Sequence, residues 1–209
     1  FEPANKAYQK TSLHGFRTFL KIREGKKTTF YEPFQNNFYF NKIYSISQNM
    51  YITSYDLRLE EINSTLGIKI EVMYCTLPGE TLSSLIRRVC ITNISEKSLE
   101  FEVIDGLPII IPYYLTDYNL KNESNLKQAW MGVENYKTIP FYKIEVLPHD
   151  TPETLYVEGG NFFLNFDFNK AKKINFSKVI IEPWVVFGSA TDLVYPENFL
   201  KEVFRVPEE

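Results

Sequence analysis

The feature that most constrains this chain is an alternation of apolar and polar side chains with a period of two residues. Ile68, Ile70 and Val72 alternate with Lys69 and Glu71. Successive side chains of a β-strand point to opposite faces, so this period indicates strands with one buried face. The same alternation recurs over residues 55–60, 68–74, 85–91 and 99–103. These runs are predicted to be strands of antiparallel sheets.

Turn-forming residues separate these runs and extend the pattern along the chain. The predicted turns cover residues 23–27, 63–65, 77–80 and 93–97, and strand patterns return at residues 141–147, 155–158, 162–168 and 179–187. Two short helices are predicted at residues 124–131 and 196–203, the second with Pro196 at its first position. Many strands linked by frequent turns favour an all-β fold, a large antiparallel sandwich of two sheets with one or two short helices.

Composition and charge narrow the classes of partner. The chain has 209 residues, of which 44% are hydrophobic, and residues 1–209 are predicted to form a single β-sandwich domain. The formal net charge of -3 gives no basic footprint, so no nucleic acid is expected. No window approaches about 18 consecutive apolar residues, so no membrane is expected either. The start at Phe1 lacks Met and a secretory signal, which predicts a cytoplasmic piece excised from a longer multidomain chain.

Residues typical of catalytic or metal sites are sparse. His14 and His149 belong to no zinc spacing, and no Gly-x-Ser-x-Gly elbow provides a nucleophile. Cys75 and Cys90 lie in strand patterns without metal-ligand spacing and are predicted to be small core or sheet residues. No catalytic residue, metal site or cofactor is therefore predicted within this chain.

Two motifs at strand ends have ordinary structural interpretations. Asp105 and Gly106 follow a strand pattern and are typical of a turn. Gly159 and Gly160 lie between strands, where a bulge or a hairpin turn explains them. Acid/base chemistry on a glycosidic bond needs two carboxyl groups flanking that bond, and the sequence alone brings no two together.

The segment 105–131 (DGLPIIIPYYLTDYNLKNESNLKQAWM) is too long for a simple turn, and loops of this length are usually functional or disordered. Its apolar and aromatic content argues against disorder. A sugar ring is bound by an apolar wall with a few placed polar groups. The candidate carbohydrate contacts are Tyr113, Asp117, Tyr118, Asn119 and Trp130. The alternative is that these rings pack the loop onto a sheet and that the amides form turns.

A family resemblance joins several of these segments. Residues 86–104 (IRRVCITNISEKSLEFEVI), followed by DGLPIIIPY, SNLKQAWM and EGGNFFLNF, resemble the N-terminal β-supersandwich domain of cellobiose-phosphorylase-like proteins. These form glycoside hydrolase family 94, formerly glycosyltransferase family 36. The resemblance covers residues 51–187 and looks closest to the branch that acts on β-1,2-linked glucans.

The resemblance implies a galactose-mutarotase-like supersandwich that is catalytically silent alone. In such proteins a helical barrel, absent from this chain, carries out inverting phosphorolysis with inorganic phosphate as co-substrate. The implied partners are that barrel in the remainder of the chain, a β-linked gluco-oligosaccharide and a possible homodimer mate. The sandwich packs on the barrel, and a loop from it, here residues 105–131, walls the substrate cleft.

Two other functions remain open at this point. An independent carbohydrate-binding module would retain its affinity for sugar when isolated. A mutarotase-like sugar epimerase would need a general acid and base flanking the ring oxygen, commonly a His with a carboxylate. Only His14 and His149 are available for that role, and both lie in turn-like contexts.

Overall fold

A computed structural model describes residues 15–35, 37–108, 110, 113, 122, 131–136, 139–144, 146–147, 155–156, 158–168 and 174–206. The chain divides into two compact units. The first unit in sequence is Arg17–Gly106, and the second combines Phe1–Phe16 with Leu107–Glu209. Each unit is described separately below, and the single domain expected for residues 1–209 stays a prediction.

The smaller sheet of the Arg17–Gly106 unit has three antiparallel strands, β1 (Arg17–Glu24), β2 (Lys27–Tyr31) and β7 (Glu100–Gly106), in the order β2-β1-β7. A two-residue turn that starts at Gly25 joins β1 to β2. Gly25 has a φ of 60°, a left-handed conformation that glycine adopts at little cost. The turn predicted at residues 23–27 is therefore confirmed.

The larger sheet of this unit is a four-stranded antiparallel meander. It contains β3 (Ile46–Ile52), β4 (Asp56–Asn63), β5 (Ile68–Thr76) and β6 (Leu85–Asn93), in that order. Three of these strands, β4, β5 and β6, follow the alternation read from the sequence. The short helix α2 (Phe38–Ile43) connects β2 of one sheet to β3 of the other, and the Asn37 side chain caps it by accepting from the Phe40 amide. Neither α2 nor β3 was predicted.

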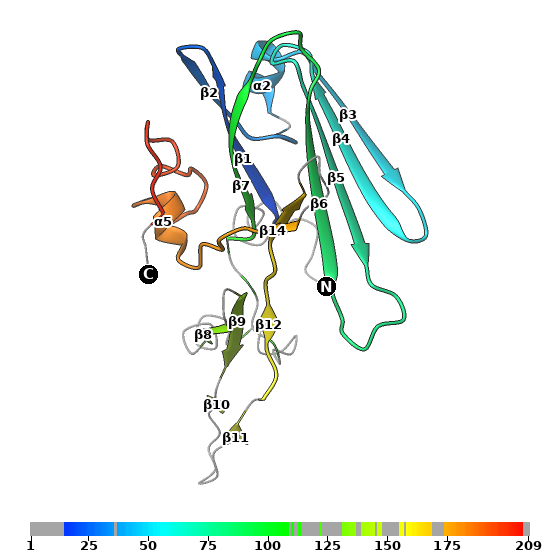
Figure 1. The fold of residues 1–209 in the computed structure, drawn as a ribbon, viewed down its shortest axis with the longest axis vertical. Coiled ribbons are helices and arrows are strands. Elements are labelled where there is room, and N and C mark those ends of the chain that lie inside the picture. Colours follow the sequence, from blue (N-terminus) through cyan, green and yellow to red (C-terminus); the bar gives the residue numbers. More distant parts are fainter. Residues whose placement is uncertain are drawn as a thin grey trace. The chain divides into compact units, whose positions relative to one another are not determined.

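The two sheets enclose one hydrophobic core (Figure 1). The smaller sheet contributes Leu20, Ile22 and Tyr31, and the larger one contributes alternate residues of β5, namely Ile68, Ile70 and Val72. Each of these side chains is buried, and burying one aliphatic side chain stabilises a fold by about 1.5–3 kcal/mol. The predicted all-β antiparallel sandwich is thus confirmed in this unit.

The second unit also contains antiparallel strands. A three-stranded sheet has the order β12-β9-β8, and two strand pairs accompany it, β10-β11 and β13-β14. Their bounds are β8 (Met131–Tyr136), β9 (Ile139–Ile144), β10 (Val146–Leu147), β11 (Leu155–Tyr156), β12 (Asn161–Phe162), β13 (Phe166–Phe168) and β14 (Ile174–Phe176). The strand patterns predicted at residues 141–147, 155–158 and 162–168 coincide with strands of this unit.

The C-terminal part of this unit differs from the prediction. Residues 179–187 were predicted as a strand, but Pro183–Phe187 form the helix α5. Proline has the right φ for the start of a helix, and a buried apolar run does not by itself distinguish strand from helix. Residues 196–203 were predicted as a helix but form turns. The amides of Asn198 and Phe199 bond instead to the Val186 carbonyl of α5.

Two further expectations need correction or lie outside the described residues. Asp105 and Gly106 were predicted as a turn, but both belong to β7, where Asp105 pairs with Thr18 and Gly106 with Arg17. The pairing with β1 extends the strand through these two residues. Of the helix predicted at residues 124–131, only Met131 is described, and it begins β8.

Candidate functional site

One of the predicted sugar contacts, Tyr113, belongs to the described residues. The others, Asp117, Tyr118, Asn119 and Trp130, lie outside them. The Tyr113 side chain is 47% exposed. Its ring lies on Gly159, where an added Cβ would come within 2.2 Å of the Tyr113 Cε1 atom. Gly159 therefore admits the Tyr113 ring, so two segments singled out in the sequence meet in the second unit.

Gly160 has a packing role of the same kind. A Cβ added there would lie 2.6 Å from both the Phe141 ring and the Tyr142 carbonyl oxygen. The two glycines lie between β11 and β12, as predicted, but what they provide is close approach of neighbouring groups. No turn or bulge is needed to explain them.

A buried carboxyl group lies in the core of the sandwich. Glu61 on β4 is fully buried. Its Oε1 atom accepts from the Tyr31 hydroxyl at 2.5 Å, and its Oε2 atom accepts from the Phe34 amide at 2.6 Å and the Gln48 amide group at 2.7 Å. Burial raises the pKa of Tyr31 far above its usual range, and the bond to Glu61 adds to the effect. Glu61 thus ties β2, β3 and β4 together.

A second polar cluster joins the two sheets at β6 of the larger sheet and at β1 and β7 of the smaller one. The Arg87 guanidinium of β6 is almost fully buried and forms an ion pair with Asp105 of β7. It also donates to the Thr18 hydroxyl at 3.0 Å and to the Tyr74 hydroxyl at 2.9 Å. The Thr18 hydroxyl donates to Asp105 at 2.6 Å. The Asp105 carboxylate is therefore held by donors of the sandwich itself, which is the arrangement of a structural anchor.

Known chemical sites find little support in the described part of the chain. No group of three or more His, Cys, Asp or Glu side chains is arranged there to hold a metal ion. His14 and His149 lie outside the described residues. Cys75 and Cys90 are free, half-buried residues of β5 and β6.

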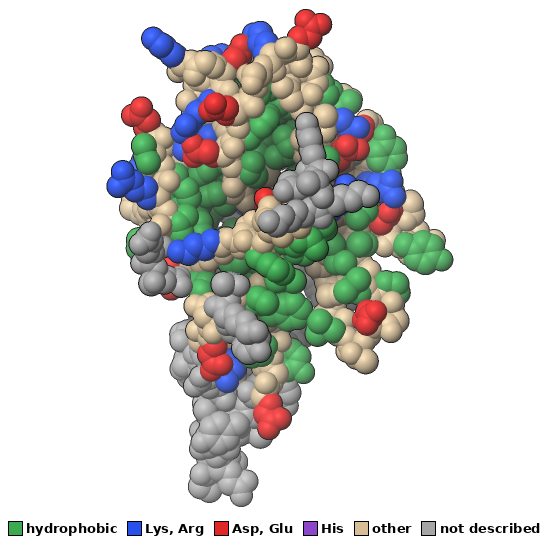
Figure 2. Space-filling model, in the orientation of Figure 1, with side chains coloured by type: hydrophobic (Ala, Val, Ile, Leu, Met, Phe, Trp, Pro, Cys, Tyr) green, Lys and Arg blue, Asp and Glu red, His purple; other side chains and the backbone are tan. Residues whose placement is uncertain are grey.

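The unusual surface of the Arg17–Gly106 unit is the hairpin formed by β3 and β4. Met50 and Ile52 stand opposite Leu59 and Leu57 of β4, on the face that carries the core. They are nevertheless 64% and 71% exposed. Tyr55, in the turn, is 85% exposed. Figure 2 shows hydrophobic side chains at the surface where this hairpin ends, at the right-hand edge of the view.

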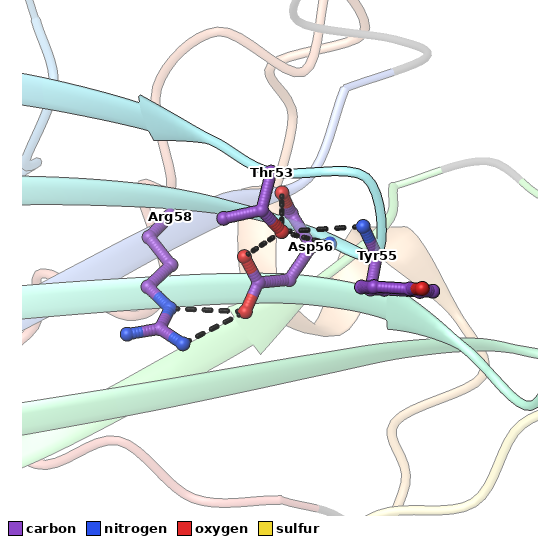
Figure 3. Close-up of polar contacts among 4 residues, drawn as sticks. All are labelled: Thr53, Tyr55, Asp56 and Arg58. Carbon is purple, nitrogen blue, oxygen red and sulfur yellow. Dashed lines mark hydrogen bonds and ion pairs between the residues drawn. The ribbon is translucent and has the colours of Figure 1, made fainter.

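The turn of this hairpin is well ordered by side-chain bonds (Figure 3). The Thr53 hydroxyl donates to Asp56 at 2.8 Å and accepts from the amides of Tyr55 and Asp56. The Arg58 guanidinium donates twice to the other Asp56 oxygen. The Thr53 bond and the Arg58 guanidinium lower the pKa of Asp56. The turn therefore orders the backbone at Tyr55, whose side chain is exposed.

The helix α2 adds a second exposed apolar surface to the same unit. Its residues Phe38, Tyr39 and Ile43 are all exposed, and the Lys42 ammonium lies 4.2 Å from the centre of the Phe38 ring. None of its side chains is buried. Sequence reasoning missed both this helix and the β3 edge, although the uncharged run ISQNMYI of β3 was a usable signal.

Comparison with known proteins adds no identity. No family model matches the chain, and no curated protein matches it. In the described residues no helix is long and apolar enough to cross a membrane. The fold class and the exposed hairpin therefore carry the functional argument.

Proposed function

We propose that this chain is a non-catalytic accessory domain of a carbohydrate-active phosphorylase, and that it works by packing against other protein surfaces. The observation that carries the proposal is the exposed apolar hairpin of β3 and β4, with Met50, Ile52 and Tyr55 at the surface. Contiguous exposed apolar patches are typical of surfaces that bind another protein. The phosphorylase context comes from the sequence resemblance, and the all-β sandwich is consistent with it.

In this proposal the catalytic barrel lies in the remainder of the chain and uses inorganic phosphate on a β-linked gluco-oligosaccharide. The sandwich contributes domain packing, a wall of the substrate cleft and a dimer contact. The sugar contacts proposed for that wall are Tyr113, Asp117, Tyr118, Asn119 and Trp130. Consistent with an accessory role, the carboxylates of the buried Glu61 and the partly exposed Asp105 are both bound by donors of the sandwich itself.

The test of catalytic silence is a phosphorolysis assay. The 209-residue chain is incubated with inorganic phosphate and either β-1,2- or β-1,4-linked gluco-oligosaccharides, with an active glycoside phosphorylase as the positive control. We expect no release of sugar 1-phosphate. Release above the enzyme-free blank, if it persists after repeated purification, contradicts the proposal.

A second candidate function is an independent carbohydrate-binding module. The observation that favours it is the exposed Tyr55 ring, which stands on an ordered turn as a sugar-stacking platform would. Calorimetric titration with β-gluco-oligosaccharides at millimolar concentration distinguishes the two functions. A module gives a binding heat that Tyr55→Ala removes and Tyr39→Ala, a change at another exposed tyrosine, leaves intact. An accessory packing domain gives no heat.

A further inference from the structure

The two sheets of the Arg17–Gly106 unit have four edge strands, and three of them carry charged side chains. The edge β2 begins with Lys27, β6 contains Arg87 and Arg88, and β7 contains Glu100 and Glu102. Charges and short length are the usual means by which sheet edges avoid pairing with another chain. The fourth edge, β3, has the sequence ISQNMYI and carries no charge.

The backbone groups that β3 presents to its free side follow from the hairpin geometry. The Thr53 amide bonds to the Asp56 carbonyl, and the Ser64 amide bonds to the Ser45 carbonyl. Both pairs continue the register in which β3 meets β4. Hydrogen-bonded and non-bonded pairs alternate along an antiparallel ladder. The odd-numbered residues of β3 therefore bond to β4, and the outward backbone groups belong to Ile46, Gln48, Met50 and Ile52.

These four residues are spaced for pairing with a second copy of the same strand. An antiparallel pairing centred on Asn49 places Ile46 opposite Ile52 of the partner subunit and Gln48 opposite Met50 of the partner subunit. Every outward amide and carbonyl of β3 then has a partner. A contact of this kind is two-fold symmetric and closes after two chains.

Side-chain chemistry agrees with this register. The paired side chains carry no charge, and the exposed apolar side chains Met50 and Ile52 extend the inner face of one sheet into that of the other. In the row of paired residues that runs through the two Asn49 residues, the nearest acidic side chains of the two copies are those of Glu60. They lie three strand spacings apart, roughly 14 Å, which exceeds the Debye length of about 8 Å at physiological salt.

From these observations we infer that β3 is a homodimer interface, in which two copies of the chain pair edge to edge about Asn49 into one continuous eight-stranded sheet. The inference deepens the proposed packing role by naming its partner and register. It rests on that role but not on the absence of catalysis. Sugar 1-phosphate release would overturn the proposed function but would not contradict the dimer. A chain that stays monomeric would overturn the dimer but would not contradict the proposed function.

The register is tested by oxidative crosslinking. In Asn49→Cys the two new thiols face each other across the two-fold axis, in a pair whose Cα atoms are about 4.5 Å apart. That distance suits a disulfide. In the matched control Ser47→Cys the two new residues lie four positions apart along the strand, roughly 13 Å, too far to bridge. We expect a covalent dimer from Asn49→Cys alone. Equal crosslinking of both variants, or of neither, overturns the inference.

The interface is tested by sedimentation of the full chain over a range of concentrations. The unmodified chain is expected to reach twice the monomer mass, and Met50→Lys is expected to raise the dissociation constant of the dimer by about 100-fold. Met50→Pro removes an outward amide without touching the β4 ladder, so it should also give a folded monomer by circular dichroism. Thr92→Lys, on the exposed end of β6, should leave the dimer intact.

Two results of the sedimentation series contradict the inference. One is a monomer at every concentration. If the amides of Gln48 and Met50 exchange slowly in that monomer, another part of the same chain covers β3, and the inference is contradicted all the same. The other is a dimer that Met50→Lys and Met50→Pro leave unchanged while both variants remain folded.

Discussion

The two edges of the larger sheet solve the problem of unpaired backbone in opposite ways. At β6, Arg87 crosses to the other sheet and binds Thr18 and Asp105, so that edge is tied into the sandwich. At β3, the side chains of Gln48 and Asn49 donate to Glu61 and Glu60 of β4. The strand itself has no charged side chain. The first edge uses polar groups for stability, and the second leaves its backbone available to another chain.

This difference separates folding from association within one sheet. Substitutions at the β6 side should change the free energy of unfolding, whereas those at β3 should change the assembly and leave the monomer fold largely intact. Glu61 links folding to association, because it binds both Gln48 of the edge strand β3 and Tyr31 of the core. The predictions below test this separation.

The largest effect is expected from Glu61→Ala. The change leaves the buried Tyr31 hydroxyl and the Phe34 amide without their acceptor, which should lower the free energy of unfolding by about 3 kcal/mol. Urea denaturation measures it. The matched control is Glu60→Ala, one residue along β4 on the opposite face, and it should change stability far less. Equal losses in the two variants would show that the core network does not anchor the edge strand.

The next effect is expected from Arg87→Met, which keeps the length of the side chain and removes its charge. Breaking a buried ion pair costs about 3–5 kcal/mol, but Asp105 is partly exposed, so a loss of about 2 kcal/mol is expected after solvent screening. Arg88→Met, an exposed neighbour on the same strand, should stay within about 0.5 kcal/mol of the unmodified chain. A dimer measured by sedimentation should survive both changes, since neither touches β3.

The sequence predicted the strands better than it predicted the surfaces. The alternation over β4, β5 and β6 is strong because each strand has one face in the core, and that face fixes the pattern. The strand β3 escaped detection because every residue after Ile46 is exposed, so burial imposes little alternation on its sequence. The helix α5 was mistaken for a strand because Val185, Val186 and Phe187 are all buried and a fully buried run has no period to read.

The candidate site was less predictable than the fold for a physical reason. Asp105 was interpreted as a turn residue because Asp-Gly is typical of turns, yet its carboxylate is held by Thr18 and Arg87, which are 87 and 18 residues away in the sequence. Contacts of that range leave no local pattern. The sugar contacts proposed at Asp117, Tyr118, Asn119 and Trp130 stay predictions.

A smaller effect is expected in alkali. The pKa of Tyr31 is raised by burial and by its bond to Glu61, so its neutral form is favoured in the folded state. The stabilisation is complete below the unfolded pKa of about 10 and is lost as the pH rises above it. Urea denaturation at about pH 9 and about pH 11 should show a smaller alkaline loss for Tyr31→Phe than for the exposed control Tyr39→Phe. An identical loss would contradict the raised pKa of Tyr31.

The smallest effect is expected in the turn between β3 and β4. The pKa of Asp56 is lowered by the Thr53 hydrogen bond and by Arg58, so its contribution is present above the unfolded pKa of about 3.9 and is lost as the pH falls through the lower folded value. Asp56→Asn weakens the Arg58 contact at every pH. Amide hydrogen exchange should therefore show less protection of the Thr53 amide, which bonds to the Asp56 carbonyl, while the core amides of β5 keep theirs. Since β3 pairs through its middle, the crosslink at Asn49→Cys should still form in the double variant. Loss of that crosslink would show that the turn, and not the uncharged strand, determines the association.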